Sequence, residues 1–486
     1  MKKSEYRANT KSANKADHKS TNKTSHKMTG NADHNASNYK VGTNADYKAS
    51  NYKVGINADH KAANKADYRS DNKTDHTASN QVCSWQKKCG GCTSINQDYQ
   101  ETLKKKETYL HKLLGNNMQW ERMVGMEYPY YYRNKVVRTF GMRRDGKKSV
   151  PCFGIYQEGT HKIVPVDSCR IEDKSAETIF RDIAELTKSF KMRFYNEDNG
   201  TGLLRHVLVR TGRKTGQVLV CLVLASPVFP GKNNFVKALR KLHPEITTIV
   251  MNINPDQTSV VLGEREEVLF GKGFIEDELM GFRFRISSKS FYQVNPVQTA
   301  KLYRQALEYA GLKGTEIVID AYCGIGTIGI CASEKAGSVI GIERNHDAVR
   351  NAFSNARCNK IKNVHFIEAD ATEEMMKMAA SGEKTDVIFL DPPRTGTTEA
   401  FIAAAAALQP ARIVYISCGP DTLARDLKVF RKFGYHAKKA RGFDMFPFTE
   451  SIETVVLLGR KGSDSKSYVS LGLDVNDYYK IKEHRG

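Results

Sequence analysis

The sequence predicts an α/β protein whose C-terminal part folds as a doubly wound, mainly parallel sheet. From residue 291 onward, short apolar runs typical of buried strands alternate with segments that carry apolar residues at helical spacing. One of these runs leads into a glycine-rich turn, and another leads to a cysteine. Polar or small residues at strand ends are typical of the edge where open α/β sheets bind their ligands.

The run 412–427 (RIVYISCGPDTLARDL) shows this pattern most clearly. Its β-branched and aromatic start, at 413–416, is typical of a buried parallel strand, and a helical spacing of apolar residues begins after Pro420. Cys418 therefore lies between a strand and a helix. The positive end of the helix dipole is expected to lower the pKa of its thiol. On this run alone, a buried cysteine that only packs is an equal alternative.

The charge balance indicates the class of partner. The chain has 486 residues with 75 Lys and Arg against 54 Asp and Glu, which gives a net charge of +21. Such a balance favours nucleic acid over a membrane as the partner. No apolar run approaches the ~20 residues of a membrane helix and no signal peptide is apparent, so a cytoplasmic protein is expected. Its ten cysteines then indicate metal binding or catalysis and not disulfides.

The two ends of the chain differ from the rest. Residues 1–81 are a low-complexity repeat, in which ASNYKVG at 36–42 recurs at 49–55. A segment with so few apolar residues cannot offset the entropy of ordering, so it is expected to be disordered. Residues 463–486 are expected to be a loose polar tail.

Three closely spaced cysteines follow the repeat, within residues 82–95. Cys83, Cys89 and Cys92, with a Gly pair between the last two, are typical of a loop that ligates a metal or an iron–sulfur cluster. Zinc sites more often pair two CxxC units or use His. A fourth ligand is required, and Cys152 and Cys169 are the candidates. Three reduced structural thiols are the alternative.

Residues 96–290 are predicted to form a central α/β substrate-binding domain. Its expected helices are 98–114 and 176–190, and its expected strands are 205–210, 217–224, 246–253 and 258–262. The segment 128–140 (YPYYYRNKVVRTF) combines aromatic and basic residues, which suits base stacking and phosphate contacts. A strand with a solvated basic face is the alternative for this segment.

In residues 291–462, acids and glycines follow successive strands. The expected helix is 297–310, and the expected strands are 316–320, 339–342, 364–368, 387–390, 435–439 and 454–459. The first strand runs into a glycine-rich turn containing Tyr322, and the second ends in Glu343, where an acid accepts hydrogen bonds from a ribose. Asp370 and Asp391 follow the next two strands. Asp391 begins an Asp-Pro-Pro turn, which is common where a methyl group moves from S-adenosylmethionine to a base or amide, and NAD is the main rival ligand of this edge.

Five motifs, in order, resemble those of the RNA uracil-C5 methyltransferase family over about residues 83–460. They are FYQVNP at 291–296, DAYCGIGT at 320–327, DPPR at 391–394, SCGP at 417–420 and DMFPFTESIE at 444–453. Within that family, the cysteine loop together with Cys169 resembles the 4Fe-4S ligand set of the enzymes that act on 23S ribosomal RNA.

The resemblance implies a Rossmann-like class I methyltransferase domain, a central RNA-binding domain and an iron–sulfur loop. It implies methylation of uridine C5 in 23S rRNA with S-adenosylmethionine, and neither a membrane nor an obligate protein partner. Cys418 matches the nucleophile and Glu453 the general base. The matching cofactor contacts are Gln293, Tyr322, Glu343 and Asp391, with Asp370 as a further candidate, and the matching cluster ligands are Cys83, Cys89, Cys92 and Cys169.

The chain departs from the family pattern at several positions. Gly419 stands where the family usually has Asn, and Phe448 and Ser451 stand where it often has His. No pattern of a small N-terminal β-barrel is apparent. A transfer-RNA uridine methyltransferase and a non-catalytic RNA-binding or ribosome-assembly protein are the competing hypotheses. The presence of both Cys418 and Glu453 argues against the second.

Overall fold

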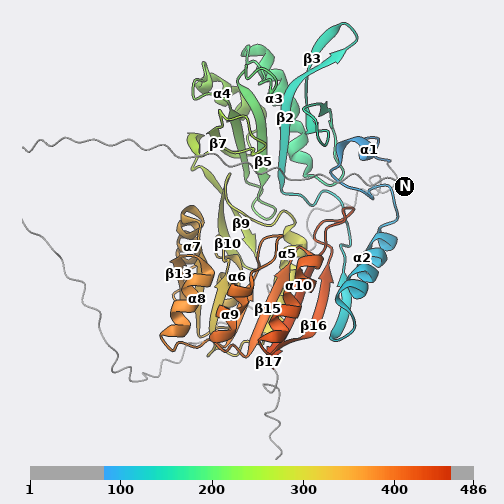
Figure 1. The fold of residues 1–486 in the computed structure, drawn as a ribbon. Helices are drawn as coiled ribbons and strands as arrows, with labels where there is room; N and C mark the ends of the chain where they lie inside the picture. Colours follow the sequence, from blue (N-terminus) through green and yellow to red (C-terminus); the bar gives the residue numbers. More distant parts are fainter. Residues whose placement is uncertain (1–81, 461–486) are drawn as a thin grey trace, which may run out of the picture. The chain divides into compact units, whose positions relative to one another are not determined.

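The computed structural model describes residues 82–460, and both the predicted disordered repeat and the predicted polar tail lie outside them. The described part contains an eight-stranded sheet, a seven-stranded sheet and a two-stranded hairpin (Figure 1). No helix within it is long and apolar enough to cross a membrane.

The eight-stranded sheet, here called the C-terminal sheet, has the order β1-β16-β17-β15-β14-β11-β12-β13. Neighbouring strands are parallel except that β17 runs antiparallel to both β15 and β16. The strands are β1 (Gln119–Val124), β11 (Ile317–Ala321), β12 (Ser338–Glu343), β13 (Val364–Glu368), β14 (Val387–Leu390), β15 (Arg412–Ser417), β16 (Tyr435–Phe443) and β17 (Glu453–Arg460). The predicted α/β fold is confirmed, and so is each strand predicted within residues 291–462.

Helices cover both faces of the C-terminal sheet because its strands are apolar on both sides. In β11, Val318 packs into one core and the next residue, Ile319, packs into the other. The first core contains α5 (Pro296–Ala310), α6 (Thr327–Ala332) and α7 (His346–Cys358). The second contains α8 (Ala371–Ala380), α9 (Glu399–Ala407) and α10 (Pro420–Lys432).

The seven-stranded sheet, here called the central sheet, has the order β4-β3-β2-β5-β6-β7-β8. Its strands are β2 (Lys135–Asp145), β3 (Lys148–Tyr156), β4 (Ile163–Val164), β5 (Leu204–Thr211), β6 (Val218–Leu224), β7 (Ile246–Ile253) and β8 (Arg265–Phe270). Helices α3 (Lys174–Ser189) and α4 (Lys232–Leu242) cover one face. The other face, through Leu208 and Cys221, shares a core with α5–α7 and with the hairpin of β9 (Phe274–Leu279) and β10 (Phe282–Ser287).

One predicted strand of the central sheet, 258–262, is wrong. The backbone there is irregular because its polar groups bond to the side chains of Asn252, in β7, and of Asn254, just after β7. Asn254 Nδ2 donates to the carbonyl oxygens of Val260 (2.7 Å) and Val261 (3.1 Å), and Asn252 Oδ1 accepts from the N–H of Gly263 (2.7 Å). Side-chain hydrogen bonds of this kind compete with a strand ladder.

Helix α2 (Tyr99–Leu114) and strand β1 precede the central sheet in the chain but pack with the C-terminal sheet. Asp98 caps α2 by accepting from the N–H of Glu101 (3.0 Å). Strand β1 then pairs in parallel with β16, and the Tyr109 hydroxyl of α2 donates to Asp421 of α10 (3.1 Å). The range 96–290, expected to be one central domain, therefore contributes its first two elements to the C-terminal sheet.

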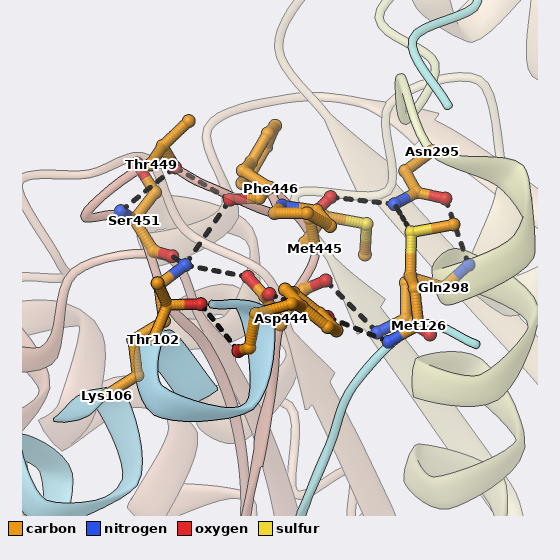
Figure 2. A network of polar contacts seen from close by, with 12 residues as sticks. Thr102, Lys106, Met126, Asn295, Gln298, Asp444, Met445, Phe446, Thr449 and Ser451 are labelled. Carbon is orange, nitrogen blue, oxygen red and sulfur yellow. Dashed lines mark hydrogen bonds and ion pairs between the residues drawn. The ribbon is translucent and has the colours of Figure 1, made fainter. Parts of the chain in front are cut away.

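A buried ion pair joins α2 to the loop that precedes β17 (Figure 2). The Lys106 ammonium lies 2.7 Å from Asp444 Oδ1 and also donates to the carbonyl oxygens of Ser451 (2.9 Å) and Phe446 (3.3 Å). The Tyr99 hydroxyl donates to the second oxygen of Asp444 (2.9 Å). Three partners around one ammonium compensate for its burial.

Helix α5 holds the same loop from the opposite side (Figure 2). Asn295 Nδ2 donates to the Met445 carbonyl (2.9 Å), and Gln298 Nε2 donates to the Asp444 carbonyl (3.1 Å). Asn295 also caps α5 by accepting from the Gln298 N–H (3.2 Å). Segment 444–451 is thus bonded to two helices that lie far apart in the sequence.

Lys106→Met is expected to destabilise the protein by about 3–5 kcal/mol, because it leaves the Asp444 carboxylate buried without its counter-charge. Chemical unfolding measures this loss. Lys104→Met, on the exposed side of the same helix, is the control and is expected to have little effect. The double variant Lys106→Met/Asp444→Asn should recover part of the stability. Equal stability of the Lys106→Met and Lys104→Met variants would contradict the prediction.

Candidate active site

Cys418 and Glu453 meet at one end of the β15–β17 ladder. The two strands are antiparallel with Ser417 opposite Thr454, so Cys418 follows β15 at the place where β17 begins with Glu453. Cys418 is partly exposed and Glu453 is buried. The thiol and the carboxyl, 35 positions apart in the numbering, therefore share one edge of the sheet.

The prediction that the helix dipole lowers the pKa of Cys418 is wrong. Burial, together with the acids Glu453 and Asp391, raises the pKa of this thiol to about 11. The Arg394 guanidinium acts in the opposite direction but is weaker. Burial also raises the pKa of Glu453 well above its usual range, and Asp391 adds to this effect. Burial of the thiol, followed by the two carboxyls, therefore outweighs the partial charge of the helix end.

The glycine-rich turn after β11 adopts the conformation that its residues predict. Gly324 has φ +56°, and a Cβ there would meet nothing within 4 Å, so the backbone faces open space. Its N–H donates to one oxygen of Glu343 (3.1 Å), whose other oxygen accepts from the N–H of Asn345 (2.7 Å). Glu343 thus ends β12 beside the turn, and its remaining lone pairs can accept hydrogen bonds from a ligand.

Tyr322 begins the same turn in a left-handed conformation, with φ +65°. Its ring stacks on Phe401 of α9 at 5.1 Å between centroids, and its hydroxyl lies 3.2 Å from Thr397 Oγ1. A non-glycine residue with positive φ is costly, and such residues cluster at ligand sites. The surrounding contacts hold this ring at the carboxyl edge of the sheet.

Two aspartates border this turn, the fully buried Asp320 and the half-buried Asp391. Asp320, the fourth residue of β11, is fully buried; its Oδ2 accepts from the N–H of Gly329 (2.7 Å), while Oδ1 has no partner among the described residues. Burial raises the pKa of Asp320 to about 7, and it also raises the pKa of Asp391 to about 7. Buried acids with spare acceptor atoms suit a ligand with positive charge or hydrogen-bond donors.

Sequence reasoning included Asp320 in a motif but assigned no role to it, and it missed Asp426. Asp426, buried in α10, accepts from the N–H of Thr397 (2.9 Å) and from the hydroxyl of Tyr415 (2.7 Å). It thereby fastens the loop after β14, which begins with Asp391, to the helix that follows Cys418. An acid inside an otherwise amphipathic helix was the only available signal.

Asp370 and Gln293 occupy different surroundings from the other candidate cofactor contacts. Asp370 caps α8 by accepting from the N–H groups of Thr372 (2.9 Å) and Glu373 (3.3 Å), and its charge contributes to the raised pKa of Tyr322. Gln293 is buried, and its carbonyl accepts from Asn134 Nδ2 (3.3 Å) at the start of the central sheet. The structure thus gives Asp370 a capping role and places Gln293 between the two sheets.

Gly419 fits the close approach of two segments. A Cβ at this position would lie 2.9 Å from the carbonyl oxygen of Arg394 and 2.6 Å from Thr422 Oγ1. A side chain here would push the loop after β14 away from Cys418. The glycine therefore matches the local packing in this chain, although the family usually has Asn.

Two aromatic residues of the segment 128–140, Tyr130 and Tyr132, pack against the rest of the protein. The segment enters strand β2 only at Lys135. Tyr130 stacks on the buried Phe448 with 5.3 Å between centroids, and the hydroxyl of the buried Tyr132 donates to the Pro447 carbonyl (3.1 Å). These two rings hold the loop before Glu453, so they are not free to stack on bases.

The cysteine segment contacts that same loop. The N–H groups of Thr93 and Ser94 both donate to the carbonyl of Phe448, at 2.9 and 3.1 Å. Cys92 packs in a small core with Phe448, and Cys83 and Cys169 lie against this core. The cysteine segment is therefore continuous with the structure that carries Glu453.

The four predicted cluster ligands lie near one another. Burial, reinforced by Cys89 and Cys83, raises the pKa of Cys92 to about 12, and burial, with Glu172 and Cys92, raises the pKa of Cys169 to about 12. Burial also raises the pKa of Cys152, but no other thiol contributes to this shift. Between residues 82 and 460, however, no group of three or more His, Cys, Asp or Glu side chains is arranged to hold a metal ion.

Known proteins are similar to this chain over most of its described length. The model of the tRNA (uracil-5-)-methyltransferase family matches residues 98–461. An uncharacterised RNA methyltransferase of Clostridium acetobutylicum is 42% identical over 386 residues, covering 78% of this chain and 83% of the relative. One of Halalkalibacterium halodurans is 39% identical over 378 residues, covering 77% and 82%.

A solved structure is also similar. The Pyrococcus abyssi tRNA (uracil-54, C5)-methyltransferase in complex with S-adenosyl-L-homocysteine matches with a TM-score of 0.64 and 27% identity, over 76% of this chain and 85% of that chain. The family predicted from the five motifs is confirmed. The chain belongs to the tRNA (uracil-5-)-methyltransferase family and is an RNA methyltransferase that uses S-adenosylmethionine.

Proposed function

We propose that the protein methylates C5 of a uridine in 23S ribosomal RNA through a transient bond between Cys418 and C6 of the base. The observation that carries the proposal is the meeting of a thiol and a buried carboxyl at the end of the β15–β17 ladder. A nucleophile and a base at the same end of one strand ladder suit covalent catalysis.

Uracil C5 is a poor nucleophile, and Cys418 supplies the missing electron density. Its thiolate adds to C6, forming an S–C6 bond and moving an electron pair towards C5, which then takes the methyl group. Glu453 accepts the C5 proton, the S–C6 bond breaks, and the thiolate is restored. When bound, S-adenosylmethionine would supply the methyl group by breaking its S–CH3 bond and leaving as the neutral thioether S-adenosylhomocysteine. Its sulfonium charge would lower the pKa of both Cys418 and Glu453.

The carboxyl edge of the C-terminal sheet offers the cofactor contacts. We assign them to Gln293, Tyr322, Glu343 and Asp391, with Asp370 as a further contact. The open space at Gly324 and the lone pairs of Glu343 support this assignment, as do the acids with raised pKa that could balance a sulfonium. Asp320, with its unpaired Oδ1, joins this set.

The choice of 23S rRNA depends on the cysteine segment, which resembles that of enzymes acting on this RNA. We propose that Cys83, Cys89, Cys92 and Cys169 hold a 4Fe-4S cluster. The support is the resemblance of the cysteine loop and the packing of Cys83, Cys92 and Cys169 at one small core. Methyl transfer moves no net electrons, so the cluster would have a structural role. Transfer RNA is the second candidate substrate, and the similarity to the Pyrococcus abyssi enzyme favours it.

Cys418→Ala is expected to reduce methyl transfer by about 10³-fold or more, because no other thiol lies at the ladder end. Glu453→Gln should still form the S–C6 bond but fail to release it, so a covalent protein–RNA complex accumulates. Labelled S-adenosylmethionine, unmodified 23S rRNA and tRNA transcripts, and denaturing gels measure both effects. Mass spectrometry of 5-methyluridine identifies the substrate.

The matched control is Glu450→Gln, because Glu450 is a nearby acid that is exposed. It should retain near wild-type transfer and trap no complex. Undiminished product from Cys418→Ala would rule out the covalent mechanism, and product only on tRNA would reject the ribosomal substrate.

Asp391→Asn is expected to stabilise the protein more at pH 8 than at pH 5, while weakening S-adenosylhomocysteine binding. The pKa of this carboxyl is raised from 3.8 to about 7 in the folded state. Its ionisation therefore costs folded-state stability as the pH rises from about 4 to 7, and Asn removes this cost. Thermal unfolding at both pH values is the measurement. The exposed Asp347→Asn serves as control. An equal gain in stability at both pH values would contradict the raised pKa of Asp391.

Anaerobically purified protein is expected to be brown and to contain about four iron atoms per chain. Cys89→Ser should lower the iron content and the visible absorbance, because one thiolate ligand is lost. Cys358→Ser, which changes a half-buried thiol of α7, should leave both unchanged. A colourless, zinc-containing wild type would reject the cluster.

A further inference from the structure

We propose that a groove on the central sheet binds a nucleobase of the RNA substrate, outside the catalytic pocket. The proposal rests on the RNA-methylating function above and extends it to a second contact with the same RNA. The groove has a volume of about 770 Å³, within the range of pockets that hold small organic groups. Its walls come from β2, β3, β5 and the loop 257–261.

The groove opens on the face of the central sheet that shares a core with α5–α7. Val137 and Thr139 alternate with residues of the opposite face, and they pair with Leu208 and His206 of β5. Val137 and Val261 line the groove and also pack against the core shared with α5–α7. A bound base would therefore lie next to the junction of the two sheets.

His206 supplies a neutral polar group to the groove wall. It is buried, its Nδ1 lies 3.1 Å from Thr139 Oγ1, and its Nε2 makes no hydrogen bond to any residue of the described range. Burial and the neighbouring Arg205 lower the pKa of His206 to about 4, so the ring is uncharged at neutral pH. An uncharged imidazole nitrogen suits the edge of a base.

Tyr156 supplies an aromatic surface beside this histidine. Its ring is half-buried and meets His206 edge-on, with 6.5 Å between centroids and 88° between planes. His161 lies 5.9 Å away from the same ring. Aromatic side chains that are held in place but partly accessible are the usual stacking partners of unpaired RNA bases.

The charges near the groove are already paired, which favours a base over a phosphate. Glu197, the acid in its lining, pairs with the buried Arg205 at 3.0 Å. Arg205 also donates to the carbonyl oxygens of Asn254 (2.7 Å) and Asp256 (2.6 Å), which fastens the start of the loop that forms one wall. None of the described lining residues is Lys or Arg, so the groove lacks the charge that a phosphate requires.

Crosslinking tests the contact directly. Wild-type protein is irradiated with 4-thiouridine-containing transcripts of 23S rRNA and of tRNA, and the crosslinked peptides are identified by mass spectrometry. Crosslinks within residues 154–161 or at His206 are expected. Crosslinks found only outside the groove would overturn the proposal.

Tyr156→Ala should weaken binding of the same transcript about 10-fold, because it removes the stacking surface. Tyr156→Phe, which keeps the ring, should retain wild-type affinity, and both variants should bind S-adenosylhomocysteine normally. Ser259→Trp places a large side chain on the exposed loop of the groove. It should also weaken RNA binding, because it obstructs the groove. Val228→Trp, at an exposed position outside the lining, should not.

Unchanged RNA affinity of Tyr156→Ala would overturn the groove while leaving the proposed reaction intact. Groove crosslinks in a protein that produces no 5-methyluridine would support the groove and reject the reaction. The two failures therefore give different results.

Discussion

The antiparallel pairing of β17 with β15 is the constraint on which the site depends. Parallel strands alone would bring loop residues to the carboxyl edge, but an antiparallel strand brings its first residue there. Glu453 can therefore begin β17 at the end of β15, beside Cys418. A shift of one residue in this pairing would move the carboxyl to the other side of the sheet.

The loop before β17 must hold its position for this pairing to be useful, and three parts of the chain contribute. Lys106 binds its start and end, α5 binds its backbone near Met445, and the cysteine segment binds the Phe448 carbonyl. These contacts come from parts of the chain that precede β11, the first strand of the C-terminal sheet after the central sheet. This explains why α2 and β1 pack with the C-terminal sheet although the central sheet separates them from it in the chain.

The electrostatics of the edge follow from crowding several acids into a buried space. Asp320, Asp391 and Glu453 each have a raised pKa because desolvation opposes their ionisation. Burial, reinforced by Glu453 and Asp391, likewise raises the pKa of Cys418 to about 11, so the protein by itself holds this thiol in its protonated form at neutral pH. A positive charge at this edge would lower the pKa of the Cys418 thiol.

The amino-acid sequence by itself determined the strands of residues 291–462, the doubly wound fold and the family, because apolar periodicity and short motifs are local properties. It also placed Cys418, Glu343 and Asp391 at strand ends. It did not predict β1, β3, β8, the hairpin of β9 and β10, or helix α4. It did not anticipate the irregular 258–262 segment, where Asn252 and Asn254 replace strand pairing, or the raised pKa of Cys418. Only the tertiary structure decided these, together with the roles of Lys106 and Asp426. Such features depend on which distant side chains share a buried volume, and local sequence carries no record of that.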